Sequence, residues 1–241
     1  MGQSVSTRML PEPEAAALLA ANGIEYCAHE SSTTAEQASV AATRIGFPVV
    51  LKVVSPDIIH KSDVGGVVLG LADSVAVRQG FDDLVADVHA RRPEAHLDGV
   101  LVCRQVGEGA EMIVGAVRDA TFGPTVMLGA GGVLTELLGD VAFRLAPLHP
   151  DDALDMMREL RAFRMLTGFR GAPPADLRAL ANVAVRLGDL MCAHPEIAEA
   201  DLNPVAALPA GCVVLDARIM VSDSRPAGVD PSLMTSGESP T

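Results

Sequence analysis

Short apolar runs rich in β-branched residues recur along the chain, and they constrain the fold more than any other feature. The run VVLKVV at 49–54 is typical of a buried strand, and three more strands are expected in succession at 99–106, 111–118 and 124–128. Because strands often follow one another without a helix between them, the pattern favours an α+β fold over a regular βαβ winding. The other expected strands are 24–28, 67–71, 144–148 and a hairpin of 200–208 with 212–220.

Five stretches are predicted to be helices from their apolar spacing and their terminal residues. Prolines suit the start of the first, a Ser/Thr cluster suits the start of the second, and Gly23 and Gly46 suit their ends. A polar loop is expected at 55–66, and the segment from Ser222 onwards, rich in Ser, Pro, Gly, Asp and Thr, is expected to be disordered. The predicted helices are 12–22, 33–45, 74–91, 150–163 and 174–193.

Length and charge exclude several classes of protein. With 241 residues, 49% of them apolar, the chain can form one large domain or two small ones. Because 31 acidic residues outnumber 18 basic ones, the net charge is −13, and we expect no nucleic-acid or anionic-membrane partner. The four cysteines form no CxxC motif, which favours a reducing cytoplasm. No signal peptide and no membrane-spanning segment are expected.

The lysines point to a candidate site. Lys52 and Lys61 are the only lysines among the 18 basic residues, and they lie close together in the sequence. An ammonium group suits single phosphate oxygens, whereas a guanidinium favours planar bidentate pairing. Lys52 interrupts an apolar strand, where an unpaired charge is costly. It therefore either points to water from an edge strand or faces a cleft that holds an anion.

The loop after this strand, SPDIIHKSDVGGV, carries His60, Lys61 and the pair Gly65–Gly66. Glycines let backbone N–H groups approach a phosphate closely, although such pairs also occur in ordinary turns. His60 is either an ordinary surface histidine or a general base or phosphoryl acceptor, because a neutral imidazole is nucleophilic.

A group of oxygen ligands is predicted near the end of the chain. Asp201 and Asn203 share a face of an extended segment, and a turn centred near Ala210 would set Asn203 opposite Asp216. Two such ligands suit a Mg²⁺ ion that bridges nucleotide phosphates. Alternatively, Asp201 and Asn203 only shape a turn before Pro204. Lysines at one end and metal ligands at the other predict a nucleotide cleft.

With these motifs, the chain resembles the ATP-grasp subunit of the nucleoside-diphosphate-forming acyl-CoA synthetases, such as the ADP-forming acetate–CoA ligases. These are relatives of the succinyl-CoA synthetase β subunit. The resemblance extends from LPEPEAAALLAANGI through GFPVVLKVVSPDIIHKSDVGGV, FGPTVMLGAGGV and DLNPV to VVLDARI, and HKSDVGGV is its most specific part. It implies an α+β, ATP-grasp fold in which two α/β subdomains clamp a nucleotide. The implied divisions are a helical lead-in at 1–21, a small subdomain at 22–100, a large subdomain at 101–221 and a disordered tail at 222–241.

The resemblance also implies roles for individual residues. His60 would accept a phosphoryl group in transit, Asp201 would lie near the phosphohistidine, and Asn203 and Asp216 would hold Mg²⁺. Six residues would bind the nucleotide: Lys52, Ile59 and Lys61 at the phosphates, Cys103 and Val106 in the hinge that recognises adenine through backbone groups, and Glu111 at the ribose.

The implied reaction is acid + CoA + ATP ⇌ acyl-CoA + ADP + phosphate, a ligase reaction in which this chain handles the nucleotide half. The implied partner is a separate CoA-binding α subunit that carries its own active histidine and binds the acid and CoA. Two alternatives remain open: a stand-alone ATP-grasp ligase that forms an acyl phosphate, and a non-catalytic nucleotide-binding module. Neither requires a phosphorylated His60, so trapping that species distinguishes them.

Overall fold

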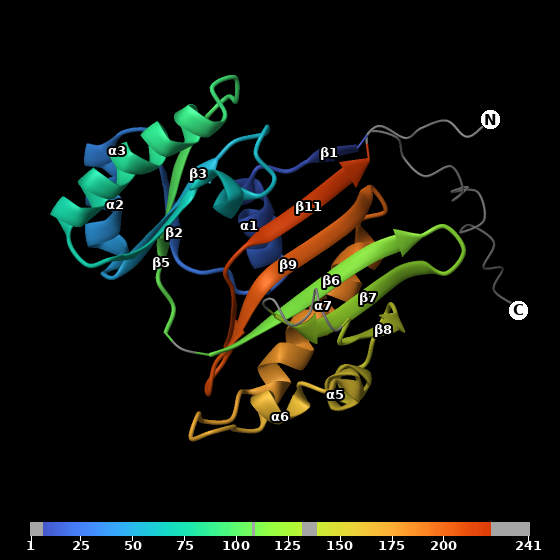
Figure 1. The fold of residues 1–241 in the computed structure, drawn as a ribbon. Helices are drawn as coiled ribbons and strands as arrows, with labels where there is room; N and C mark the ends of the chain where they lie inside the picture. Colours follow the sequence, from blue (N-terminus) through green and yellow to red (C-terminus); the bar gives the residue numbers. More distant parts are fainter. Residues whose placement is uncertain (1–6, 108, 132–138, 223–241) are drawn as a thin grey trace, which may run out of the picture.

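Two β-sheets with helices packed against them organise the chain (Figure 1). The structure is a computed structural model that describes residues 7–107, 109–131 and 139–222. Helix α1 (Glu12–Ala21) packs between the sheets, because its buried residues share one core with strands of both.

The smaller sheet has four strands and is covered on one face by two helices. Its strand order is β2–β5–β3–β4, so β3 is an interior strand. The side chains of β3 alternate: Leu51 and Val53 pack with the two helices, whereas Val50 and Val54 pack with α1 and the larger sheet. Lys52 lies in the second set and therefore faces the other lobe. The elements of this lobe are β2 (His29–Ser32), α2 (Ala35–Ile45), β3 (Val49–Val54), the 3₁₀ turn η1 (Lys61–Val64), β4 (Val67–Leu71), α3 (Ser74–Arg91) and β5 (Gly99–Arg104).

The larger sheet has seven strands, in the order β1–β11–β9–β6–β7–β8, and β10 also pairs with β9. Met112, Val114 and Ala116 of β6 point into the core, and the residues between them point to the opposite face. Asp201 and Asn203 of β9 share that opposite face with Gly115. The elements of this lobe are β1 (Thr7–Met9), β6 (Ala110–Asp119), β7 (Gly123–Ala130), β8 (Val141–Leu145), α5 (Pro150–Glu159), α6 (Phe163–Leu166), α7 (Leu177–Ala193), β9 (Ile197–Ala207), β10 (Cys212–Val214) and β11 (Ala217–Ser222).

Side-chain caps explain where three helices begin. The Thr34 side chain accepts a hydrogen bond from the backbone N–H of Gln37 at the start of α2. Asp73 and Asp176 accept equivalent bonds at the starts of α3 and α7. These caps satisfy N–H groups that lack partners within the helix.

Most predicted elements are confirmed, and β4 and α3 have the expected bounds. The strand predicted at 24–28 is wrong, because only Tyr26 forms a bridge, to Val214. The strand predicted at 144–148 lies three residues earlier as β8, since Pro147 has no N–H for a ladder. The helix predicted at 150–163 ends at Glu159, where Asp140 takes the N–H groups of the residues that follow.

The C-terminal hairpin has the expected register, with Val214 opposite Val205. Its second strand is nevertheless divided, because β10 ends at Val214 and β11 begins at Ala217. The predicted tail lies, apart from Ser222, outside the described residues. The predicted division at residues 100 and 101 stays a prediction. Strand β5 continues the smaller sheet to Arg104, and the next strand, β6, belongs to the larger sheet.

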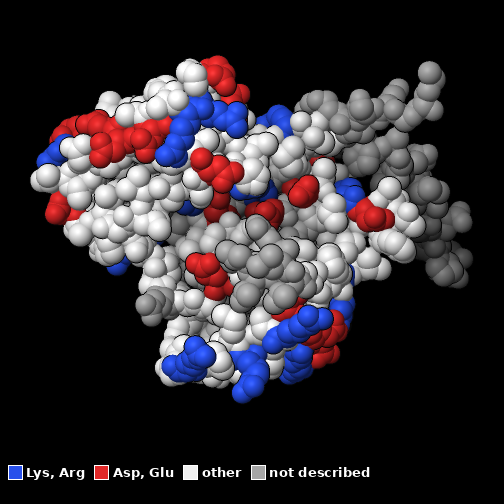
Figure 2. Space-filling view, viewed as in Figure 1, with Lys and Arg blue, Asp and Glu red and all other residues white. Residues whose placement is uncertain are grey.

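Charged side chains are unevenly spread over the surface. On the face shown in Figure 2, acidic side chains gather over α3 and basic side chains gather around α5 and α6. Lys52 and Lys61 differ from such surface groups, because their side chains are only 10% and 12% exposed. Within the described ranges, no helix has the length and apolar character needed to cross a bilayer.

Candidate functional site

Four charged side chains from four segments meet where the lobes face each other. Lys52 from β3 lies 2.9 Å from Glu12 Oε1 and 3.5 Å from Asp216 Oδ1. Lys61 from η1 lies 2.7 Å from Glu12 Oε2 and 2.9 Å from Asp216 Oδ1. Each ammonium therefore contacts both carboxylates. We call Glu12, Lys52, Lys61 and Asp216 the lysine–carboxylate cluster.

Lys52 belongs to the interior of the smaller sheet, so the alternative of an edge strand with its lysine in water is wrong. The residue is 8% exposed. Burial alone would lower the pKa of Lys52, but Asp216 and Glu12 outweigh burial and raise that pKa above its ordinary value. Lys52 therefore stays positively charged inside the protein.

The break between β10 and β11 presents a backbone acceptor to the same site. Pro204 lies opposite Leu215 on the paired strand, and a proline has no N–H to offer to the Leu215 carbonyl. That carbonyl instead accepts hydrogen bonds from Lys52 Nζ and from Tyr26 Oη, the latter at 3.1 Å. The interrupted strand is thus part of the site's construction, and it places Asp216 next to both lysines.

Glu12 is a site residue that the sequence analysis missed. It is the first residue of α1 and is 6% exposed, and it also accepts a hydrogen bond from Tyr26. Burial would raise the pKa of Glu12, but Lys52 and Lys61 outweigh burial and hold the pKa at about 2. One signal was available: a lysine inside an apolar strand needs a buried acid, which another element must supply.

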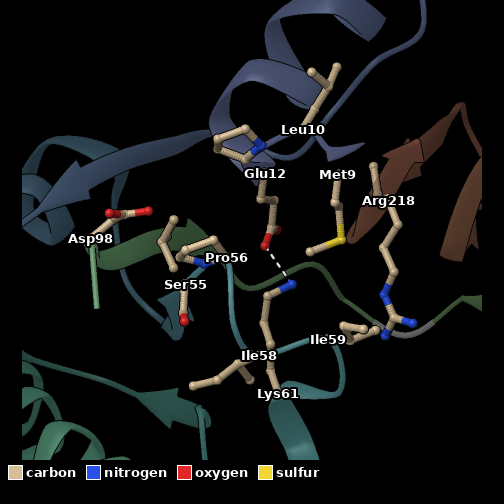
Figure 3. Close-up of a pocket in the computed structure, with 13 residues that line it drawn as sticks. Met9, Leu10, Glu12, Ser55, Pro56, Ile58, Ile59, Lys61, Asp98 and Arg218 are labelled. Carbon is tan, nitrogen blue, oxygen red and sulfur yellow. Dashed lines mark ion pairs between the residues drawn. The ribbon is translucent and has the colours of Figure 1, made fainter. Parts of the chain in front are cut away.

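Ile59 and Lys61 lie on one segment beside Glu12 (Figure 3), and His60 stands between them in the sequence. His60 and Ile59 are exposed, whereas Lys61 points inward to Glu12, from the opposite side of a small cavity. The N–H of Gly66 donates to the Lys61 carbonyl at 2.8 Å, so the segment folds as a tight turn. The exposed His60 is thus the direct sequence neighbour of a lysine of the cluster.

Asn203 and Asp216 occupy facing positions on neighbouring segments, as the sequence predicts. The Asn203 N–H donates to the Asp216 carbonyl at 3.0 Å. Asn203 is exposed, and Asp216 is half-buried. The alternative in which Asp201 and Asn203 shape a turn is wrong, because β9 runs through both.

Asp201 lies on β9 opposite Gly115, on the face of the larger sheet that α7 does not cover. Burial raises the pKa of Asp201, and the nearby Arg218 partly offsets that rise. No contact between the described residues joins Asp201 to His60. The structure therefore does not test the predicted relationship between these two residues.

A cavity of about 820 Å³ adjoins the cluster, and Leu215 belongs to its wall. Val106 and Glu111, two of the predicted nucleotide contacts, also line it. Cys103 does not, since its side chain is buried in β5 beside Cys27. The hydrogen bond with Cys27, together with burial, raises the pKa of Cys103 well above its ordinary value. The N–H groups of the next two residues, Arg104 and Gln105, donate to the carbonyls of Ala28 and Pro48.

Two largely buried ammonium groups, two oxygen side chains at facing positions of neighbouring segments and a nearby cavity suit a polyphosphate with a bound divalent cation. Lys52, Lys61 and Asp216 are brought into direct contact, and Asn203 lies beside them. Val106 and Glu111 lie on the adjoining cavity.

Comparisons with known proteins agree with a site for a nucleotide. A family model described as an ATP-grasp domain matches residues 3–221. The chain is 42% identical over 214 residues to the ADP-forming acetate–CoA ligase I subunit beta of Pyrococcus furiosus, a match that covers 89% of this chain and 92% of that protein. It is 44% identical over 206 residues to ADP-forming acetate–CoA ligase I of Archaeoglobus fulgidus, where the match covers 86% of this chain but only 30% of that longer protein.

Solved structures share the fold. Acetyl-coenzyme A synthetase 1 of Ca. Korarchaeum cryptofilum, in complex with coenzyme A, Ca-AMPCP and HgCl⁺, superimposes with a TM-score of 0.87 at 44% identity, covering 89% of this chain and 93% of that one. Another structure of that protein holds coenzyme A and Mg-AMPPCP, with a phosphohistidine segment that points towards the nucleotide binding site. Its TM-score is 0.77 at 41% identity, with the same coverage. The predicted ATP-grasp fold is confirmed.

Proposed function

The chain belongs to the ATP-grasp family, and from that premise we propose that it is the nucleotide-handling subunit of an ADP-forming acyl-CoA synthetase. The reaction is acid + CoA + ATP ⇌ acyl-CoA + ADP + phosphate. The lysine–carboxylate cluster beside the 820 Å³ cavity carries this proposal, because it supplies phosphate-binding cations and metal-binding oxygens at one place. The relatives named as ADP-forming acetate–CoA ligases support it.

ATP binds with its phosphates at Lys52 and Lys61 and its adenosine in the large cavity. The two ammonium groups neutralise phosphate oxygens, and Ile59 lies on the segment over them. Glu111 contacts the ribose from the cavity wall, and the backbone from Cys103 to Val106 recognises adenine. The positions of Val106 and Glu111 on that wall support this arrangement.

Asn203 and Asp216 are the residues that would hold Mg²⁺. They offer two hard oxygen donors, one exposed on β9 and one half-buried in the break before β11, which leaves room for the further oxygen ligands that Mg²⁺ requires. The donor set therefore fits the ion. Held by these two residues, Mg²⁺ would supply positive charge to offset that of the nucleotide phosphates.

His60 carries the phosphoryl group between ATP and the partner's site. The imidazole attacks the γ-phosphorus, so a P–N bond forms while the bond to the bridging oxygen breaks and ADP leaves. Lys61, the next residue, offsets the charge of the arriving phosphate, and Asp201 lies near the phosphorylated ring. The exposure of His60, directly before Lys61 of the cluster, supports this role, because a carrier must reach two sites.

The CoA chemistry takes place on a separate α subunit with its own active histidine. The match to 92% of a protein named as a beta subunit supports this division, and the chain spans only 30% of a longer ligase. We place the complex in the cytoplasm, and the four free cysteines suit a reducing compartment.

Reconstitution tests this division of labour. The purified chain should bind ATP with Mg²⁺ but form little acyl-CoA, and addition of the CoA-binding subunit should restore ADP-forming synthesis and yield a stable complex. Acyl-CoA formation is measured by chromatography and association by size exclusion. Full synthetase activity from the single chain would contradict the proposal.

A further inference from the structure

Glu12 connects two parts of the chain that are far apart in sequence. It begins helix α1, whose residues Ala15, Ala16 and Leu19 are fixed in the core that this helix shares with strands of both sheets. Its carboxylate contacts Lys52 through Oε1 and Lys61 through Oε2, at 2.9 and 2.7 Å. Figure 3 shows Glu12 and Lys61 reaching towards each other from opposite sides of the small cavity.

The contact with Lys61 is what compensates Glu12 Oε2. This oxygen is buried and accepts no hydrogen bond of good geometry from the described residues, so the Lys61 ammonium is its neutralising neighbour. An uncompensated charge inside a protein is costly, and this cost favours the state in which Lys61 stays in place.

Lys61 in turn fixes the segment that carries His60. It opens the turn η1, and its carbonyl accepts the N–H of Gly66 at 2.8 Å. The His60 side chain is exposed, while the neighbouring ammonium is held by carboxylates from α1 and from the break before β11. The position of the segment therefore depends on an ion pair made outside its own lobe.

We infer that Glu12 is a positioning residue: through Lys61 it anchors the His60 segment to helix α1. The relevance of this anchor to catalysis rests on the proposed function, because the anchored segment carries the histidine that is proposed to accept the phosphoryl group. The anchoring itself is a property of the chain alone, and it requires no nucleotide, metal or partner.

The scarcity of lysines gives a direct test. Apart from the terminal amine, Lys52 and Lys61 are the chain's only amines, so acylation by an N-hydroxysuccinimide ester followed by peptide mass spectrometry reports each one separately. In Glu12→Gln, Lys61 should be acylated about tenfold faster than in the wild type, the factor expected when a charge-assisted hydrogen bond is lost. Glu14→Gln, an exposed change in the same helical turn, should leave the Lys61 rate unchanged.

Hydrogen exchange supplies the second measurement and covers the case in which Glu12→Gln folds poorly. Lys61→Met leaves the pair of Glu12 with Lys52 intact, and it should speed exchange of the Gly65 and Gly66 amides while exchange in α1 stays unchanged. If the pair of Lys61 with Glu12 only stabilised the fold, hydrogen exchange in Lys61→Met would be faster in α1 as well. Unchanged Lys61 acylation in folded Glu12→Gln, or unchanged loop exchange in Lys61→Met, would overturn the inference. Both measurements are made without nucleotide, so failure of the wild type to bind ATP would contradict the proposed function and not this anchor.

Discussion

Three oxygen acceptors surround the ammonium of Lys52: the Glu12 carboxylate, the Asp216 carboxylate and the Leu215 carbonyl. These contacts keep the Lys52 side chain protonated although it is buried in the sheet. Under the proposed function, an arriving phosphate would meet an ammonium that is already desolvated and oriented. Such preorganisation lowers the cost of binding.

Two replacements of Lys52 distinguish the effect of its charge on ATP binding from the effect of its side-chain shape. Lys52→Arg keeps the positive charge, but the larger planar guanidinium does not fit in place of a lysine that is only 8% exposed. Calorimetry should therefore show an ATP affinity lowered by about tenfold or more. Lys52→Ala should weaken binding further and also lower the free energy of unfolding by about 3 kcal/mol, because buried Glu12 loses a partner. Arg44→Lys, on the exposed surface of α2, is the control. Equal ATP affinity for the wild type and Lys52→Arg would argue against a phosphate contact.

Glu12 shows why part of the site could not be predicted from sequence. Acids in the first turn of a helix are ordinarily explained by the helix dipole, and EPE at 12–14 contains two of them. Only the packing of α1 against both lobes reveals that Glu12 turns inward while Glu14 stays exposed. By contrast, the facing positions of Asn203 and Asp216 followed from a single turn, since the register of a hairpin is a local property.

At the scale of the element, the turn η1 and strand β4 depend on close packing against β3. A Cβ atom added to Gly66 would lie 2.5 Å from Val53 Cγ1 and 3.0 Å from the Lys61 carbonyl oxygen. Val53 is fully buried, so it has little room to move. The pair Gly65–Gly66 therefore has a packing role in addition to any approach to phosphate.

Gly66→Ala should lower the free energy of unfolding by about 1–3 kcal/mol, the usual cost of overpacking. Chemical denaturation measures the change. Gly107→Ala is the matched control, because an added Cβ there meets nothing within 4 Å. Equal losses in the two variants would show that the close contact with β3 does not limit this position.

Elements were predicted well where local patterns decide them and less well where distant residues do. The apolar run of β4 and the capped helix α3 needed only neighbouring residues. The division of β10 from β11 needed Pro204 across the ladder and Lys52 in the other lobe, contacts that no local pattern encodes. The early end of α5 likewise depends on Asp140, which lies well before it in the chain.

Across the whole molecule, the cluster links stability to pH. The pKa of Glu12 is about 2, below its model-compound value of 4.5, because Lys52 and Lys61 outweigh burial. A lowered pKa means that this stabilisation is complete above pH 4.5 and is lost as the pH falls towards 2. Its size is about 3 kcal/mol when the shift is converted to free energy.

Acid titration of the folded protein tests this linkage. Between pH 4.5 and 2, the free energy of unfolding should fall less steeply in Glu12→Gln than in the wild type, as followed by urea denaturation at each pH. Glu14→Gln should retain the wild-type slope, since Glu14 is exposed. An unchanged slope in Glu12→Gln would mean that other carboxylates account for the acid sensitivity.

The measurement that tests the account most directly is the transfer of phosphoryl from ATP to His60. The chain is incubated with γ-labelled ATP, Mg²⁺ and the CoA-binding subunit, and the label on each chain is followed through acid and base. We expect an acid-labile, base-stable label on this chain in the wild type and in His96→Ala, an exposed histidine on another loop. His60→Ala should retain ATP binding but lose both the label and acyl-CoA synthesis. A label found only on the partner, with full synthesis by His60→Ala, would contradict the account.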